Sequence, residues 1–120
     1  MKSFLWIDCE TTGLKPMQHD IVQLACIPVI NGVPQTPFNE FCQPLDFSTV
    51  DKEAVNVHGI TVERMRNFQS PQDLLEKIIT YLKSFNTKFT LAGYNVNFDK
   101  AFLGSFFAKQ NKSTYYSELF

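Results

Sequence analysis

Two carboxylates stand side by side near the start of the chain, Asp8 and Glu10, in the stretch FLWIDCETTGL of residues 4–14. Side chains on a strand alternate between faces, so both acids would point the same way, with Cβ atoms about 7 Å apart. Like charges at this spacing repel and raise a pKa unless a cation lies between them. Hard divalent ions such as Mg²⁺ bind through carboxylate oxygens, so the pair is a candidate metal site. The alternative is a pair of solvated acids beyond the strand end, followed by an ordinary turn at residues 11–13.

Composition favours one globular domain, residues 1–120, with a single hydrophobic core. No apolar run approaches the ~20 residues of a membrane span, and MKSFLWID does not match a signal peptide. We therefore expect a cytoplasmic protein with no membrane partner. The net charge of −1 gives no general attraction to nucleic acid. Basic residues are concentrated in residues 77–120, which could touch phosphates, although scattered lysines are more often a solvated surface.

The three cysteines are Cys9, Cys26 and Cys42, widely spaced and without a CxxC pattern. This pattern indicates neither a disulfide framework nor a zinc site. We interpret all three as small buried hydrophobic residues. His19 lies in a polar loop, and we expect its side chain to be exposed.

The first half of the chain predicts three strands. Residues 3–9 and 20–30 have strand-like patterns, Asn31-Gly32 marks a hairpin turn, and a third strand begins in FNEFCQPL, residues 38–45. Short connections make these strands an antiparallel meander.

The second half predicts helices around one further strand. A short helix is expected to stop near Gly59, with another brief turn at residues 61–64. Ser70 and Pro71 open a longer helix as N-cap and first helical residue. The stretch KFTLAGYN, residues 88–95, is expected to run parallel to another strand because a helix precedes it. Residues 98–109 predict an amphipathic helix, and residues 111–120 could at most begin a strand.

This order predicts an α/β or α+β domain with a mixed sheet. If the parallel strand lies beside the first strand, the two form a switch point in the strand order. Ligands of open α/β sheets collect beyond the carboxyl ends of such strands, where the strand order reverses. Asp99 falls in the first turn of the helix that follows the parallel strand, so three carboxylates would converge on one crevice. Asp99 alone could also be an ordinary acid at a helix N-terminus.

Three segments together resemble the DnaQ-like (DEDDh) 3'-5' exonuclease superfamily, the group that includes proofreading subunits of bacterial replicative polymerases and RNase T. Residues 8–14, DCETTGL, match its first exonuclease motif, and residues 95–99, NVNFD, match its second. Residues 57–61, VHGIT, match the segment between them. The matches occur in family order over most of the chain.

The resemblance implies a ribonuclease H-like sheet and two divalent ions, Mg²⁺ or Mn²⁺, that cleave a terminal phosphodiester. Asp8 would bridge both ions, Glu10 would hold the ion on the side of the attacking water, and Asp99 would bind the other. Partners would be 3' ends of single-stranded DNA or RNA, with a polymerase as a further candidate. Substrate-binding residues implied by the family are Thr11, Thr12, Leu14, His58, Asn95 and Phe102. Phe102 also suits the apolar side of its helix, and His58 suits the end of its helix.

The family's third motif, a His followed five residues later by an Asp, is absent from these 120 residues. Its general base and fourth metal ligand are therefore missing, and the final strand and helix of the fold are not represented. We expect a domain that is incomplete at its C-terminus, and three explanations stay open. The chain could be a piece of a full exonuclease, half of an assembly completed by a second chain, or a catalytically degenerate nucleic-acid-binding or scaffold module.

Overall fold

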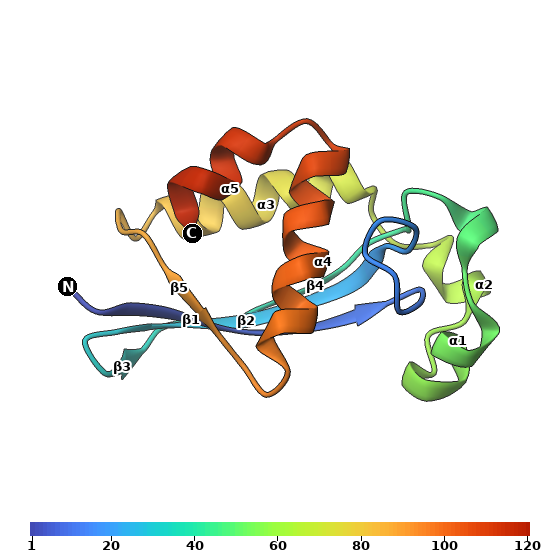
Figure 1. Cartoon of the computed structure of the whole chain (residues 1–120), viewed down its shortest axis with the longest axis horizontal. Coiled ribbons are helices and arrows are strands. Elements are labelled where there is room, and N and C mark those ends of the chain that lie inside the picture. Colours follow the sequence, from blue (N-terminus) through green and yellow to red (C-terminus); the bar gives the residue numbers. More distant parts are fainter.

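The structure is a computed structural model that describes all residues from Met1 to Phe120. A five-stranded mixed sheet carries three helices, α3, α4 and α5, on one face, while two short helices, α1 and α2, lie at one end (Figure 1). This is the predicted α/β architecture. None of the helices combines the length and the apolar character needed to cross a membrane.

The sheet is built around its two longest strands, β1 (Ser3–Thr11) and β2 (Ile21–Ile30), which pair antiparallel. A hairpin at Asn31 and Gly32, with φ of 51° and 80°, connects β2 to β3 (Val33–Pro34). Positive φ at both turn residues matches the twist of a two-residue hairpin, and Asn and Gly adopt it readily. β4 (Phe38–Phe41) also pairs with β2, so the meander is confirmed, with the short β3 as an additional strand.

β5 (Thr90–Ala92) pairs with β1 in parallel, with Leu5 opposite Leu91 and Trp6 opposite Ala92. The preceding helix α3 (Pro71–Lys83) provides the crossover that a parallel pair requires. α3 begins as predicted, because the side chain of Ser70 accepts a hydrogen bond from the Asp73 amide and Pro71 occupies the first turn. The predicted parallel pairing is thus confirmed, and its partner is β1, the arrangement on which the expected crevice depends.

The remaining helices are short, apart from α4 (Val96–Lys109). A 3₁₀ turn, η1 (Phe47–Thr49), precedes α1 (Lys52–His58) and α2 (Val62–Met65). α1 ends at Gly59, whose φ of 74° is the left-handed conformation typical of a helix C-terminus.

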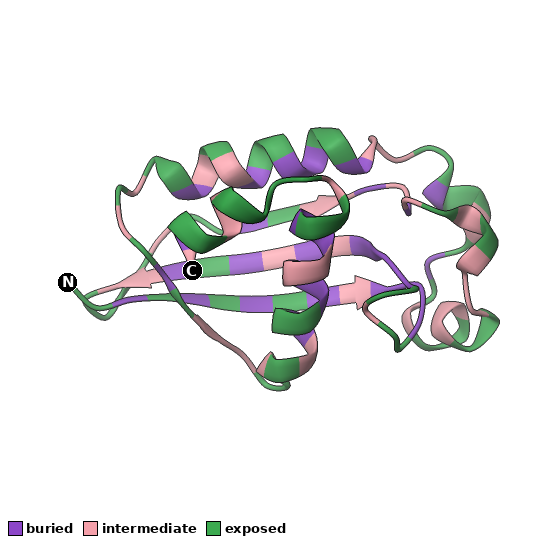
Figure 2. Ribbon diagram, turned by 45° about the horizontal axis from the view of Figure 1, so that its top comes forward, coloured by how far each residue is buried: buried purple, intermediate pink, exposed green.

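The core lies between the sheet and the helices on its one covered face. Burial alternates along β1, so that Leu5, Ile7 and Cys9 are buried beneath the helices while Phe4 and Trp6 are exposed on the opposite face (Figure 2). All three cysteines are buried and free, as predicted. The buried residues of β1 therefore pack in the core, whereas the side chains on its opposite face are free to form a binding site.

Two predictions are wrong. Residues 111–120 do not begin a strand but form α5 (Ser113–Leu119), because Tyr115, Tyr116, Leu119 and Phe120 share a helical face that packs on the core. His19 is buried, with 7% of its surface exposed, because its ring lies against Gly13 and its Nδ1 accepts the Lys15 amide.

Candidate active site

The three carboxylates line one open cavity of about 860 Å³. Asp8 and Glu10 extend from the last part of β1, and Asp99 lies in the first turn of α4. The parallel pairing of β5 with β1 brings the start of α4 across the end of β1. A direct contact fixes this arrangement, since Asp99 Oδ1 accepts a hydrogen bond from the Cys9 amide at 2.9 Å.

Two of the three carboxylates, Glu10 and Asp99, have raised pKa values. Burial raises the pKa of Glu10, and the charges of Asp8 and Asp99 raise it further, while His58 acts in the opposite direction. Burial also raises the pKa of Asp99, which is only 5% exposed, and Asp8 adds to this. Hydrogen bonding to Cys9 partly offsets the rise for Asp99. The site thus concentrates negative charge that a cation would relieve.

The donor set is compatible with a hard divalent ion, because it consists only of carboxylate oxygens. One oxygen of Asp99 is already bonded to the Cys9 amide. In the geometry of the structure, however, no group of three or more His, Cys, Asp or Glu side chains is arranged to hold a metal ion. Holding an ion with all three carboxylates would therefore require the site to rearrange.

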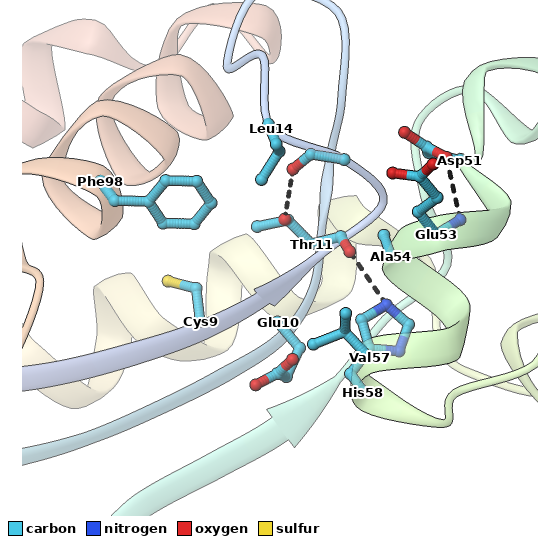
Figure 3. Close-up of a pocket in the computed structure, with 11 residues that line it drawn as sticks. Cys9, Glu10, Thr11, Leu14, Asp51, Glu53, Ala54, Val57, His58 and Phe98 are labelled. Atoms are coloured by element: carbon cyan, nitrogen blue, oxygen red, sulfur yellow. Dashed lines mark hydrogen bonds between the residues drawn. The ribbon is translucent and has the colours of Figure 1, made fainter.

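A second, smaller cavity of about 260 Å³ adjoins the first beyond Glu10. Figure 3 shows it between the end of β1, the following loop, α1 and the start of α4. Thr11, Leu14 and His58 line it, and Leu14 is 78% exposed. Its wall combines apolar side chains, among them Leu14, Val57 and Phe98, with the acids Glu10, Asp51 and Glu53.

His58 fastens α1 to the end of β1 through both of its ring nitrogens. Its Nδ1 accepts the Ile60 amide at 3.0 Å, so the proton resides on Nε2, which donates to the Thr11 carbonyl at 3.0 Å (Figure 3). Neither nitrogen is left free for a proton transfer. His58 therefore positions the wall of the smaller cavity.

The six predicted substrate-binding residues do not all reach a cavity. Thr11, Leu14 and His58 line the smaller one and Asn95 lines the larger one. Thr12 is fully buried and its hydroxyl accepts the Asp20 amide, so it secures the loop. Phe102 is 1% exposed and belongs to the core beneath the sheet.

Phe98, rather than the predicted Phe102, is the aromatic residue of α4 that lines the cavities. It lines both cavities and its ring points from α4 toward Leu14 (Figure 3). The rings of Phe98 and Phe102 are 4.8 Å apart, so the buried ring supports the accessible one. The sequence could have predicted Phe98 at the cavity, because Phe98, Phe102 and Phe106 recur every four residues and only Phe98 falls in the first turn, beside Asp99.

The loop of residues 12–20 is held against α4 by a partly buried ion pair, in which Asp20 is buried and Lys109 is partly exposed. Lys109 Nζ donates to Asp20 Oδ1 at 3.0 Å and to the His19 carbonyl at 2.8 Å. The other oxygen of Asp20 accepts the Asp46 amide. The Ser105 hydroxyl donates to the Pro16 carbonyl, a second tie from α4. This loop carries Leu14, so α4 sets the width of the smaller cavity.

Residues 5–116 match the family model described as exonuclease. The chain belongs to this family, within the DnaQ-like 3'-5' exonuclease superfamily. The match covers β1 through most of α5 and includes every residue of the candidate site, and it supports a nuclease function.

Curated relatives and solved structures agree with this assignment. The chain is 30% identical over 111 residues to an oligoribonuclease of Vibrio parahaemolyticus, covering 85% of this chain and 61% of the relative. It is 25% identical over 101 residues to a PolC-type DNA polymerase III of Thermotoga petrophila, covering 84% of this chain and 7% of the polymerase. The fold matches E. coli exonuclease I, solved in complex with a dT13 oligonucleotide, with a TM-score of 0.76 and 25% identity. That alignment covers 91% of this chain and 24% of exonuclease I, and it supports the ribonuclease H-like fold.

Proposed function

We propose that the chain is a metal-dependent 3'-5' exonuclease domain that hydrolyses the terminal phosphodiester of single-stranded DNA or RNA. The observation that carries the proposal is the meeting of Asp8, Glu10 and Asp99 in one cavity beside the switch between β1 and β5. Membership of the exonuclease family supports the nuclease part of this proposal. The oligoribonuclease and polymerase relatives are compatible with RNA and DNA substrates alike.

The carboxylates of Asp8, Glu10 and Asp99 would hold Mg²⁺ or Mn²⁺ ions, which when bound lower the pKa of the attacking water and stabilise the leaving 3' oxygen. The chain's own groups would bind and orient the strand end. The terminal base would enter the smaller cavity between Leu14 and Phe98, where an apolar contact tolerates any base.

Backbone groups of the loop after β1 are suited to the terminal sugar. The Thr12 amide is used by the Asp20 carbonyl, but the amides of Gly13 and Leu14 have no backbone partner. Gly13 lines the smaller cavity. These donors would meet the 3' hydroxyl, while the His58 bond to the Thr11 carbonyl keeps the loop in place.

The test is release of nucleoside monophosphate from a 3'-labelled single strand with Mn²⁺. Asp8→Asn should lower the rate by at least about 100-fold, because an exposed ligand is removed without disturbing the core. Glu76→Gln, an exposed acid on α3 outside both cavities, is the matched control and should retain the parent rate. Equal rates for Asp8→Asn and the parent would overturn the assignment of the site.

One observation favours a second candidate, a nucleic-acid-binding module without catalysis. Both histidines of the chain are engaged, His58 by Ile60 and Thr11 and His19 by Lys15, so neither offers a free imidazole as general base. This module would bind 3' ends more tightly with Mg²⁺ but form no product. Metal-independent binding that Glu10→Ala leaves unchanged would exclude it.

A further inference from the structure

Two aromatic side chains stand exposed on the wall of the larger cavity, on the side away from the smaller one. Trp6 is 52% exposed and Tyr94 is as accessible as in an isolated peptide, at 106%. Both line the cavity that holds the carboxylates. Neither ring is needed by the core, which lies on the other face of the sheet.

The strand geometry sets these rings in line with the catalytic candidates. Trp6 and Asp8 share a face of β1 two residues apart, which places them about 7 Å from each other. Trp6 pairs with Ala92 of β5, and Tyr94 follows two residues later. We call Trp6 and Tyr94 together the aromatic floor. Along β1, the aromatic floor comes first, the carboxylates follow, and the smaller cavity lies beyond them.

The chemistry of this floor selects its occupant. The larger cavity is lined by three acids, no basic residue and a majority of hydrophobic side chains. In this acidic cavity a phosphate would bind only through a cation held by the carboxylates. A flat uncharged ring, by contrast, can stack on the indole of Trp6 or the phenol of Tyr94 whether or not the carboxylates are charged. The occupant is thus a nucleobase of a nucleotide whose 3' phosphodiester, the scissile one, lies at the carboxylates.

We propose that Trp6 and Tyr94 form a stacking subsite for the base of the nucleotide that precedes the 3'-terminal one. This inference rests on the proposed function, because it places the scissile phosphate at Asp8, Glu10 and Asp99. The terminal base occupies the smaller cavity, and the preceding base lies on the aromatic floor, so the two cavities hold consecutive nucleotides. The subsite selects unpaired strands, since a paired base cannot offer its face to the floor.

Trp6 is the only tryptophan of the chain, so its fluorescence reports directly on this face. The probes are thymidine monophosphate, a thymidine dinucleotide, and the same dinucleotide with an abasic 5' unit. Titrations use Ca²⁺ as the divalent ion, with the ligands checked for integrity afterwards. The dinucleotide should quench Trp6, whereas the mononucleotide and the abasic dinucleotide should leave its emission nearly unchanged.

Calorimetry of the variants provides the second measurement. Tyr94→Leu and Trp6→Leu should each weaken dinucleotide binding by about tenfold, the loss expected from one stacking partner, and should not change binding of the abasic dinucleotide. Tyr94 is fully exposed, so its replacement does not threaten the fold. Phe4→Leu replaces an exposed aromatic ring on the same face of β1 outside both cavities, so it is the matched control and should bind like the parent.

The outcomes separate this inference from the proposed function. Dinucleotide binding without quenching, and with parent affinity in Tyr94→Leu, would overturn the subsite while leaving the exonuclease site intact. Failure to bind any of the three probes would overturn both. A third outcome would also overturn the subsite. If the emission of Trp6 shifts with protein concentration in the absence of ligand and sedimentation shows dimers, a second copy of the chain covers this face.

Discussion

At the scale of single residues, the site is defined by burial of two of its carboxylates, with mutual repulsion as a smaller contribution. Glu10 and Asp99 both have raised pKa values, for which burial is the main cause, with Asp8 adding to the rise in each. Residues that stabilise a fold rarely show this pattern, whereas residues kept for binding a cation do. The hydrogen bond from the Cys9 amide holds Asp99 in place despite that repulsion.

Replacing Glu10 with Gln should therefore stabilise the metal-free protein, and more so at pH 7 than at pH 4. The pKa of Glu10 is raised above its usual 4.5, so between these values the folded state holds a proton that the unfolded state has lost. Stability of the parent falls as the pH rises through this window, and Gln removes that loss. Thermal unfolding in EDTA at both pH values measures the difference.

Mn²⁺ provides the control for this prediction. The ion should raise the melting temperature of the parent and have a smaller effect on Glu10→Gln, because binding to the folded state stabilises in proportion to affinity. Glu76→Gln should alter unfolding by less than about 0.5 kcal/mol at either pH. A Gln variant that is less stable than the parent at pH 7 in EDTA would show that Glu10 is a structural residue.

At the scale of elements, the loop of residues 12–20 depends on α4 for its position. The turn after β1 was identifiable from TTGL, but the partners of the loop were not, because Lys109 lies almost 90 residues further along the chain. The burial of His19 was missed for the same reason. A histidine ring in a polar loop looks exposed until the loop is seen to fold over it, with Gly13 leaving room for the ring.

Lys109→Met should lower the free energy of unfolding by about 2–3 kcal/mol. The substitution leaves the Asp20 carboxylate, 3% exposed, without its cation, and such losses cost about 3–5 kcal/mol when both partners are buried. The Lys109 side chain is 25% exposed, so the effect is expected somewhat below that range. Urea unfolding measures it.

The surface pair of Lys77 and Glu40 is the matched control. Their side chains are 55% and 36% exposed, so Lys77→Met should cost less than about 1 kcal/mol. The double substitution Asp20→Asn with Lys109→Met should recover part of the loss, because the unpaired charge is removed. Equal costs for the two lysine substitutions would contradict a structural role for the buried pair.

At the scale of the whole molecule, much of the architecture followed from local patterns. The apolar pattern of residues 3–9, the Asn-Gly turn and the Ser-Pro helix start each predicted one element, and the helix before β5 predicted a parallel pairing. Local patterns did not predict the features that tertiary packing decides. These are the helix α5 where a strand was expected, Phe98 instead of Phe102 at the cavity, and the burial of Thr12 within its loop. The roles of the site residues remain predictions.

Gly93 helps to set the position of Asp99, because it lies between β5 and α4, the helix that carries Asp99. A Cβ at this position would lie 2.7 Å from the Ile7 carbonyl oxygen of β1, a backbone atom that cannot move away without breaking the pairing. Gly93→Ala should therefore destabilise the fold by about 1–3 kcal/mol and weaken Mn²⁺ binding, because Asp99 is displaced from Asp8 and Glu10.

Gly104 in the middle of α4 offers a matched control for this substitution. Its Cβ would meet only the Tyr116 ring at 3.8 Å, an ordinary contact, so Gly104→Ala should stabilise the protein by about 0.5–1 kcal/mol and leave Mn²⁺ binding unchanged. Thermal unfolding and Mn²⁺ titration of both variants compare the two positions. If Gly93→Ala binds Mn²⁺ like the parent, the contact of β5 with β1 does not set the distance between Asp99 and the pair on β1, and the packing of α4 alone would have to position Asp99.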